Sequence, residues 1–279
     1  MTHPTIAFLG AGHLGKSMMA GLLANGYKPE KLWATTHSEN SRQHVTQEFS
    51  GVHVTTDNHD AVLHADVVVL SVLPKQVKSL LESLQIRFHQ QKPLIISVAA
   101  GVTVEYIERW LGGHFPIVLA MPNMPSQLRV GATGLYANSA VNEAQKKIAA
   151  SLFEGLGLVV WVTVPEGINQ VLAISGSGPA YFFRFMECMQ KTAEKMGLNR
   201  ETARQLAAQT ALGAAKMVLE TNESLAALWH SVAVPGGTTE AALQVFNQAN
   251  LEDVVARAME AAYNRSKAIS QSLGEPTHS

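Results

Sequence analysis

The 279-residue sequence contains a single cysteine, Cys188, so no intrachain disulfide can form. Its charges almost cancel, with 21 lysines and arginines against 22 aspartates and glutamates, and no basic run occurs. These absences argue against nucleic acid or an anionic membrane as a partner. No apolar run approaches the roughly 20 residues that span a bilayer, and residues 1–9 lack the segments of a signal peptide. We therefore expect a protein of the reducing cytoplasm, with no nucleic-acid and no membrane partner.

The sequence also lacks the usual catalytic constellations. It has no His/Cys cluster with metal-ligand spacing, no nucleophile elbow and no obvious pair of carboxylates, so we predict no metal site. Cys188 lies in an apolar helical stretch, and we expect it to be buried and inert. His230 offers a possible base, although a histidine at a helix end is more often structural. Hydride transfer to an already polarised C=N bond needs no strong base, so it is compatible with a chain that lacks these catalytic groups.

The beginning of the chain carries a glycine pattern in a complete strand–turn–helix setting. Residues 5–9 form a short apolar run, residues 16–25 a helical stretch, and residues 31–36 a second strand candidate. Between the first two lies a GxGxxG pattern, made of Gly10, Ala11, Gly12, His13, Leu14 and Gly15. This arrangement is typical of a dinucleotide-binding βαβ unit. The alternative is a tight turn that binds nothing.

Each glycine of this pattern has a physical role. Gly10 allows the tight turn, Gly12 lets the backbone approach a pyrophosphate, and Gly15 lets the helix pack closely on the strand. The start of the helix supplies free N–H groups and the positive end of its dipole. We expect His13 to face the phosphates or solvent.

The end of the second strand candidate indicates which dinucleotide is bound. NAD sites usually place Asp or Glu there, whereas this chain has Thr35, Thr36, His37 and Ser38. Hydroxyls, an imidazole and the nearby Arg42 suit a 2′-phosphate, which a carboxylate would repel. We therefore predict NADPH as the cofactor, with NADH as a weaker one. Thr36 and Ser38 could also cap the next helix, and the two roles are compatible.

The pattern of predicted strands and helices changes near residue 164. Up to there, helical stretches alternate with apolar runs of strand length, which are residues 52–56, 67–73, 94–99, 117–121, 131–136 and 159–162. Such alternation is typical of a doubly wound, mainly parallel α/β sheet of Rossmann type. Beyond it the strand signal stops and good helix formers predominate. We predict a Rossmann domain at residues 1–163 and an all-α domain at residues 164–279.

The helical half contains one face of mostly small side chains. The face is made of residues spaced three and four apart, namely Ala203, Leu206, Ala207, Thr210, Ala214 and Met217. Small residues allow close approach of helices, so we expect this helix to be buried in a core that a second subunit completes. The alternative is a monomer whose helices pack on the Rossmann domain.

Glycine-rich loops and strand ends are the candidate ligand-binding segments. Ligands of open α/β sheets bind outside the carboxyl ends of the strands, which draws attention to Asn58 and to residues 73–75, 99–101 and 121–125. In the helical half, residues 175–181 and 234–240 each precede a helix. The second loop combines two glycines with two threonines and suits a carboxylate, unless a threonine there is a simple N-cap.

Several of these segments resemble one family, the Δ1-pyrroline-5-carboxylate reductases, which catalyse the last step of proline biosynthesis. The stretches that carry the resemblance are Ser97–Thr103, Met121–Pro125, Ile174–Tyr181, Leu206–Met217 and Pro235–Thr239. The resemblance runs in order from about Ile6 to about Lys267, which is nearly the whole chain.

The resemblance implies an oxidoreductase that uses NADPH to reduce the C=N bond of Δ1-pyrroline-5-carboxylate to L-proline. It also implies a Rossmann domain followed by a helical dimerisation domain, with active sites at the interface of a homodimer and, in some members, assembly into a decamer. The cofactor residues would be Gly10, Ala11, Gly12, His13, Leu14, Gly15, Thr36, Asn58, Ser71, Val72, Leu73, Pro74, Val98, Ala99 and Ala100. The substrate carboxylate would bind to Pro235, Gly236, Gly237, Thr238 and Thr239, with the Thr239 hydroxyl as the catalytic group near the ring nitrogen.

The chain departs from the family pattern at three places. Leu73 stands where the family usually has lysine, Met124 where threonine is common, and Val234 where serine is common. These departures make another cyclic imine an alternative substrate. A β-hydroxyacid dehydrogenase is a further alternative, but it would place a catalytic lysine at the start of a long helix, and only Lys191 and Lys195 lie further along. The remaining alternative is a catalytically silent NADP-sensing protein.

Overall fold

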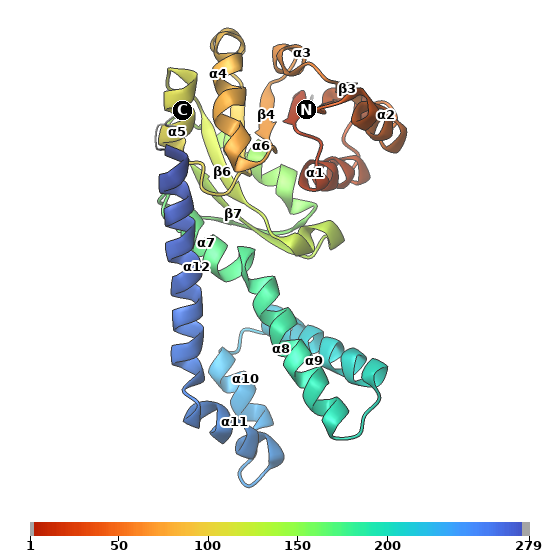
Figure 1. The fold of residues 1–279 in the computed structure, drawn as a ribbon, viewed down its shortest axis with the longest axis vertical. Coiled ribbons are helices and arrows are strands. Elements are labelled where there is room, and N and C mark those ends of the chain that lie inside the picture. Colours follow the sequence, from red (N-terminus) through yellow and green to blue (C-terminus); the bar gives the residue numbers. More distant parts are fainter. Residues whose placement is uncertain (1–2, 275–279) are drawn as a thin grey trace. The chain divides into compact units, whose positions relative to one another are not determined.

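The computed structural model describes residues 3–274, which fall into two compact units. The sheet unit comprises the described chain up to residue 177 together with residues 262–274. The helical unit comprises residues 178–261. Figure 1 shows both units coloured along the sequence. Within residues 3–274, no helix is long and apolar enough to cross a membrane.

The sheet unit is built around eight strands in the order β3-β2-β1-β4-β5-β6-β7-β8. Their bounds are β1 Ile6–Leu9, β2 Leu32–Thr35, β3 His53–Thr55, β4 Val67–Leu70, β5 Leu94–Ser97, β6 Ile117–Met121, β7 Gly131–Ala137 and β8 Gly157–Trp161. Neighbouring strands are parallel except β6 and β7, which are antiparallel. The strand order reverses at β1, between β2 and β4, as in dinucleotide-binding sheets. The predicted doubly wound, mainly parallel sheet is confirmed.

Helices cover both faces of this sheet (Figure 1), which is why the central strands β1, β4 and β6 are apolar throughout. Ile6 and Phe8 of β1 belong to the core under α1, α2 and α6, whereas Ala7 and Leu9 belong to the core under α3, α4, α5 and α7. The bounds are α1 His13–Ala24, α2 Glu39–Glu48, α3 Asn58–Leu63, α4 Pro74–Gln91, α5 Val104–Leu111, α6 Glu143–Glu154 and α7 Gly167–Val171. Short 3-10 turns lie at Pro29–Lys31 (η1) and Met124–Leu128 (η2), and a π-helical turn at Leu172–Gly176 (η3).

Helix α12, Leu251–Gly274, contributes its last turns to the sheet unit. The Ser266 hydroxyl donates a hydrogen bond to Asn169 Oδ1 of α7 at 2.7 Å. The Tyr263 phenol donates to the Glu166 carboxylate, and this bond raises the pKa of Tyr263 above its ordinary value. These polar contacts fix the end of α12 on α7.

The helical unit contains α8 Gly178–Lys195, α9 Arg200–Glu220, α10 Leu225–Val232, α11 Thr238–Gln248 and the beginning of α12. Helix α8 packs along α9, and the rings of Phe185 and Phe246 lie 6.1 Å apart. Much of the apolar surface stays uncovered in the single chain, including Phe182 and Phe183. Exposed apolar area on this scale is typical of an interface with another protein surface.

One expectation for this unit is wrong for the single chain, because Cys188 is exposed rather than buried. The small-residue face of α9 is only partly covered: Ala203 and Ala207 are buried, but Leu206 and Met217 remain 54% and 52% exposed, which leaves room for the expected second subunit. The reason is that helical periodicity identifies which face is apolar and says nothing of what covers it.

Candidate active site

The turn between β1 and α1 has the geometry that its glycines predict. Gly10 adopts a φ of +102°, which L side chains rarely take. A Cβ at this position would also lie 2.8 Å from Val72 Cγ1. Gly15 is equally constrained, because its Cβ would lie 2.8 Å from the Gly10 carbonyl oxygen. Only glycine fits either position without moving the backbone.

Gly12 differs from both, since a Cβ there would meet no heavy atom within 4 Å. It is the N-cap of α1, makes no side-chain cap, and is followed by a first turn without acidic residues. By contrast, side chains cap α2, α3, α5, α6, α9 and α10. The first N–H groups of α1 therefore face open space, which fits the pyrophosphate of a dinucleotide.

Side chains from two neighbouring strands hold this glycine turn in place. The Ser71 hydroxyl, just after β4, donates to the Gly10 carbonyl oxygen at 2.7 Å. Thr35 Oγ1, at the end of β2, accepts from the Gly10 N–H at 3.1 Å. Ser71 was predicted to line the cofactor, and the structure gives it a bracing role beneath the turn. Thr35 was named only among the hydroxyls near a 2′-phosphate, and its bracing role was not predicted. A hydroxyl at the end of the strand beside a glycine turn is the signal for that role.

The sheet brings the other predicted cofactor residues to the same edge. Strands β1 to β5 run parallel, so the segments after them emerge together at their carboxyl ends. The predicted residues in these segments are Thr36, Asn58, Ser71, Val72, Leu73, Pro74, Val98, Ala99 and Ala100. Adjacent segments are joined by backbone bonds, from Ser71 N–H to the Leu9 carbonyl at 3.0 Å and from Val98 N–H to the Leu70 carbonyl at 3.2 Å.

The residues predicted to hold a 2′-phosphate are partly engaged with one another. Ser38 caps α2, its Oγ accepting from the Ser41 N–H at 3.3 Å, and the Thr36 hydroxyl donates to the Ser38 carbonyl at 3.2 Å. The Arg42 guanidinium binds Glu39, with Nε 2.8 Å from Oε2. This hydrogen bond holds the pKa of Glu39 below its usual range. Glu39 therefore competes with a phosphate for the Arg42 guanidinium.

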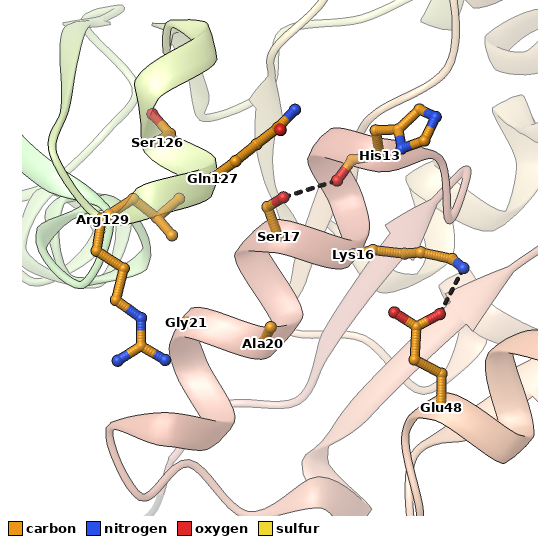
Figure 2. Close-up of a pocket in the computed structure, with 10 residues that line it drawn as sticks. His13, Lys16, Ser17, Ala20, Gly21, Glu48, Ser126, Gln127 and Arg129 are labelled. Carbon is orange, nitrogen blue, oxygen red and sulfur yellow. Dashed lines mark hydrogen bonds and ion pairs between the residues drawn. The ribbon is translucent and has the colours of Figure 1, made fainter. Parts of the chain in front are cut away.

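A polar cavity of about 350 Å³ lies beside α1 (Figure 2). Its lining residues are His13, Lys16, Ser17, Ala20, Gly21, Glu48, Ser126, Gln127, Arg129 and Leu156. It shares only His13 with the predicted cofactor residues. The Lys16 ammonium is paired with Glu48 across it at 2.5 Å. The cavity thus flanks the glycine turn along α1 and does not coincide with the carboxyl edge of the sheet.

The second glycine loop lies in the helical unit, at the start of α11. Gly237 is the N-cap of this helix and Thr238 its first residue, so neither threonine is the simple N-cap that was the alternative interpretation. Gly236 has a φ of +73°. The Gly236 N–H donates to Glu240 Oε2 at 2.8 Å, a contact that the sequence analysis missed. Glu240 lies on the next turn from Gly236, and this spacing is the signal that would have found it.

The other candidate catalytic residues, His230 and Lys191, lie in surroundings that do not favour a catalytic role. His230 is exposed at the end of α10 and stacks on Trp229, with ring centroids 3.6 Å apart. Lys191 lies well inside α8, where Glu187 binds its ammonium group at 2.5 Å. The start of α8, Gly178–Pro179, offers no lysine. The start of α8 therefore offers no catalytic lysine to a β-hydroxyacid dehydrogenase.

Comparisons with known proteins agree with this geometry. Residues 165–269 match a family model described as pyrroline-5-carboxylate reductase dimerisation, and residues 5–101 match one described as NADP oxidoreductase, coenzyme F420-dependent. A pyrroline-5-carboxylate reductase of Vibrio alginolyticus is 45% identical over 96% of this chain and 98% of its own length. A solved pyrroline-5-carboxylate reductase from Coxiella burnetii has 45% identity and a TM-score of 0.91, over 96% and 99% of the two chains. That of Plasmodium falciparum, solved with NADP bound, has 27% identity and a TM-score of 0.84, over 97% and 99%.

An uncapped glycine turn at the carboxyl edge of a Rossmann sheet, followed by a helical unit, defines a dinucleotide-dependent oxidoreductase. The matches extend over both units and nearly the full length of the relatives. The chain belongs to the pyrroline-5-carboxylate reductase family.

Proposed function

We propose that this protein reduces the C=N bond of Δ1-pyrroline-5-carboxylate with NADPH and forms L-proline. The observation that carries the proposal is the pair of helices, α1 and α11, that begin at glycines without a side-chain cap. The open start of α1 suits the pyrophosphate of a cofactor. The start of α11, where Glu240 takes the Gly236 N–H, offers its remaining N–H groups to the carboxylate of a substrate. When bound, NADPH supplies the hydride, and the imine carbon accepts it.

The residues of this chain then have mainly to bind and orient. The turn Gly10–Gly15 holds the pyrophosphate, and the segments after β2 to β5 line the rest of the cofactor. The loop Pro235–Thr239 holds the substrate carboxylate through its N–H groups. The Thr239 hydroxyl donates a hydrogen bond or proton to the ring nitrogen, which becomes the secondary amine of proline. Fixing both reactants in this way can lower the barrier without a strong base.

The direct test measures oxidation of NADPH, and separately of NADH, with Δ1-pyrroline-5-carboxylate as the acceptor. We expect rapid oxidation of NADPH, slower oxidation of NADH, and one proline formed per cofactor oxidised. A six-membered cyclic imino acid tests the alternative substrate, because Leu73 and Met124 expose 59% and 64% of their surfaces and could meet a larger ring. A folded protein that binds NADPH and reduces neither imine would contradict the proposal.

Replacing Thr239 with alanine should lower kcat roughly 10²-fold, the scale of a lost proton donor. NADPH affinity should stay unchanged, since the substitution lies outside the cofactor residues. Thr239→Ser, which keeps the hydroxyl, is the matched control and should recover most of the turnover. Unchanged turnover in Thr239→Ala would remove this residue from the reaction.

Replacing Gly237 with valine should raise the KM for the imino acid at least tenfold. The added Cβ would lie 2.9 Å from the Val234 carbonyl oxygen, so the loop must shift and its N–H groups lose their alignment. The KM for NADPH should change little in the same steady-state measurements. Normal kinetics with both substrates would show that the carboxylate binds elsewhere.

We further propose that the functional domains are residues 1–163, which bind NADP(H), and 164–279, which carry dimerisation and the substrate loop. The exposed apolar faces of α8 and α9 support a homodimer as the working unit, and higher assembly such as a decamer would build on it. A single cysteine suits the reducing cytoplasm as its location. Sedimentation analysis at enzyme concentrations used for kinetics tests the assembly.

A further inference from the structure

Asn123 joins three segments of the sheet unit that are distant in the sequence. It is the second residue after β6 and the N-cap of η2. Its Oδ1 accepts a hydrogen bond from the Ala132 N–H of β7 at 2.9 Å. Its Nδ2 donates to the Ser175 carbonyl oxygen at 3.1 Å, in the π-helical turn η3. The Asn123 side chain thus donates one hydrogen bond and accepts another.

The bond to Ser175 supplies a donor that α-helical geometry cannot provide at this position. In an α-helix the Ser175 carbonyl would accept from the N–H four residues later. That residue is Pro179, which has no N–H. The Asn123 amide donates to this half-buried carbonyl instead, so the bond supports the shape of the turn.

The turn that Asn123 holds lies against the carboxyl end of β6. A Cβ on Gly176 would come 4.0 Å from the sulfur of Met121, the last residue of that strand. Strand β6 pairs in parallel with β5, so its carboxyl end continues the edge where the predicted cofactor segments emerge. Single π-helical turns inside helices occur frequently at functional sites, where they displace the backbone locally.

We propose that Asn123 is a positioning residue for the reduction: its amide holds the turn Leu172–Gly176 against the carboxyl end of β6, where the turn forms part of the wall that orients the imine. This inference rests on the proposed function. Asn123 itself need not touch substrate or cofactor, since its side-chain donor and acceptor are both used within the protein.

The variant Asn123→Asp tests the donor separately from the acceptor. Aspartate has nearly the same shape and keeps an oxygen for the Ala132 N–H, but its ionised form places a charge against the Ser175 carbonyl. We expect kcat to fall about ten- to hundredfold, the scale of a small misplacement of reactants, while NADPH affinity changes less than about twofold. As the pH falls, the new carboxyl group protonates and can donate, so the kcat ratio of variant to wild type should rise.

The chain offers a matched control at the opposite end of the same strand. Asn138 Oδ1 accepts from the Ile117 N–H at 3.1 Å, and its Nδ2 donates to the Phe115 carbonyl at 2.9 Å. It is 7% exposed, so Asn138→Asp should lower Tm at least as much as Asn123→Asp. It should nevertheless leave kcat of the folded enzyme near the wild-type value. Equal losses of kcat in both variants would reduce Asn123 to a merely structural role and overturn the proposal.

Hydrogen exchange tests the contact between Asn123 and Ser175 without any measurement of enzyme activity. Amides of residues 172–177 should exchange faster in Asn123→Asp than in the wild type, and at the wild-type rate in Asn138→Asp. Unchanged exchange in Asn123→Asp would overturn the proposal whatever the kinetics show. If the wild type failed to reduce the imine, the proposed function would fall, and the exchange result alone would still decide whether Asn123 holds the turn.

Discussion

Replacing Gly12 with valine should raise the dissociation constant for NADPH at least 100-fold, equivalent to about 2.7 kcal/mol of binding free energy. The fold should survive, because a Cβ at this position meets no heavy atom within 4 Å. The two added methyl groups would occupy the space in which the N–H groups at the start of α1 meet the pyrophosphate. Fluorescence titration with NADPH measures the loss, and thermal unfolding without cofactor checks the fold.

Ala20→Val is the matched control for this variant. Ala20 is exposed on α1, away from the glycine turn, so valine there places the same side chain on the same helix without reaching the anion site. We expect its NADPH affinity to equal that of the wild type. Tight NADPH binding by Gly12→Val would show that the pyrophosphate does not lie at this helix start.

The second large effect is expected at the end of β2, where Thr36→Glu should reverse the cofactor preference. A carboxylate at about 4 Å from a phosphate costs roughly 1 to 4 kcal/mol, so binding of NADPH should weaken at least about fivefold relative to NADH. The same carboxylate can accept bonds from the ribose hydroxyls of NADH, as acidic residues do at this position in NAD sites. The measurement is the ratio of kcat/KM for the two cofactors.

Glu39→Gln provides the opposite test on the same site. Glu39 binds Arg42 in the first turn of α2, and removing the carboxylate charge frees the guanidinium for a 2′-phosphate. NADPH affinity should rise while NADH affinity stays constant. An unchanged cofactor ratio in both variants would show that the 2′-phosphate binds away from Thr36 and Arg42.

The elements near the glycine turn could be predicted because their conformation is set locally. Gly10 needs a positive φ, Gly15 needs close packing, and both requirements follow from short-range sterics that the sequence pattern carries. Strand-length apolar runs likewise predicted the sheet, since a strand buried on both faces must be apolar throughout. Leu73, Met124 and Val234 could also be identified from the sequence, because each is a single residue that differs from the family pattern within a short motif.

Contacts between distant segments could not be predicted in this way. Ser71 reaches Gly10 across 61 residues, and Asn123 reaches Ser175 across 52 residues. The sequence does not indicate which distant group a polar side chain after a strand will choose as its hydrogen-bond partner. The choice is made by the order of strands in the sheet, which brings β4 beside β1 and places the turn η3 beside β6.

The sequence by itself therefore determined the fold class and the glycine turn, because these depend on local sterics and on the periodicity of apolar residues. The family followed from the resemblance of several motifs spread along the chain. Only the tertiary structure decided that Ser71 and Thr35 brace the turn, that Glu39 occupies Arg42, and that Glu240 occupies the Gly236 N–H. It also decided that Cys188 is exposed in the single chain. The physical reason is the same in each case: hydrogen bonds and burial depend on which surfaces meet in space, and a linear pattern specifies only the surfaces themselves.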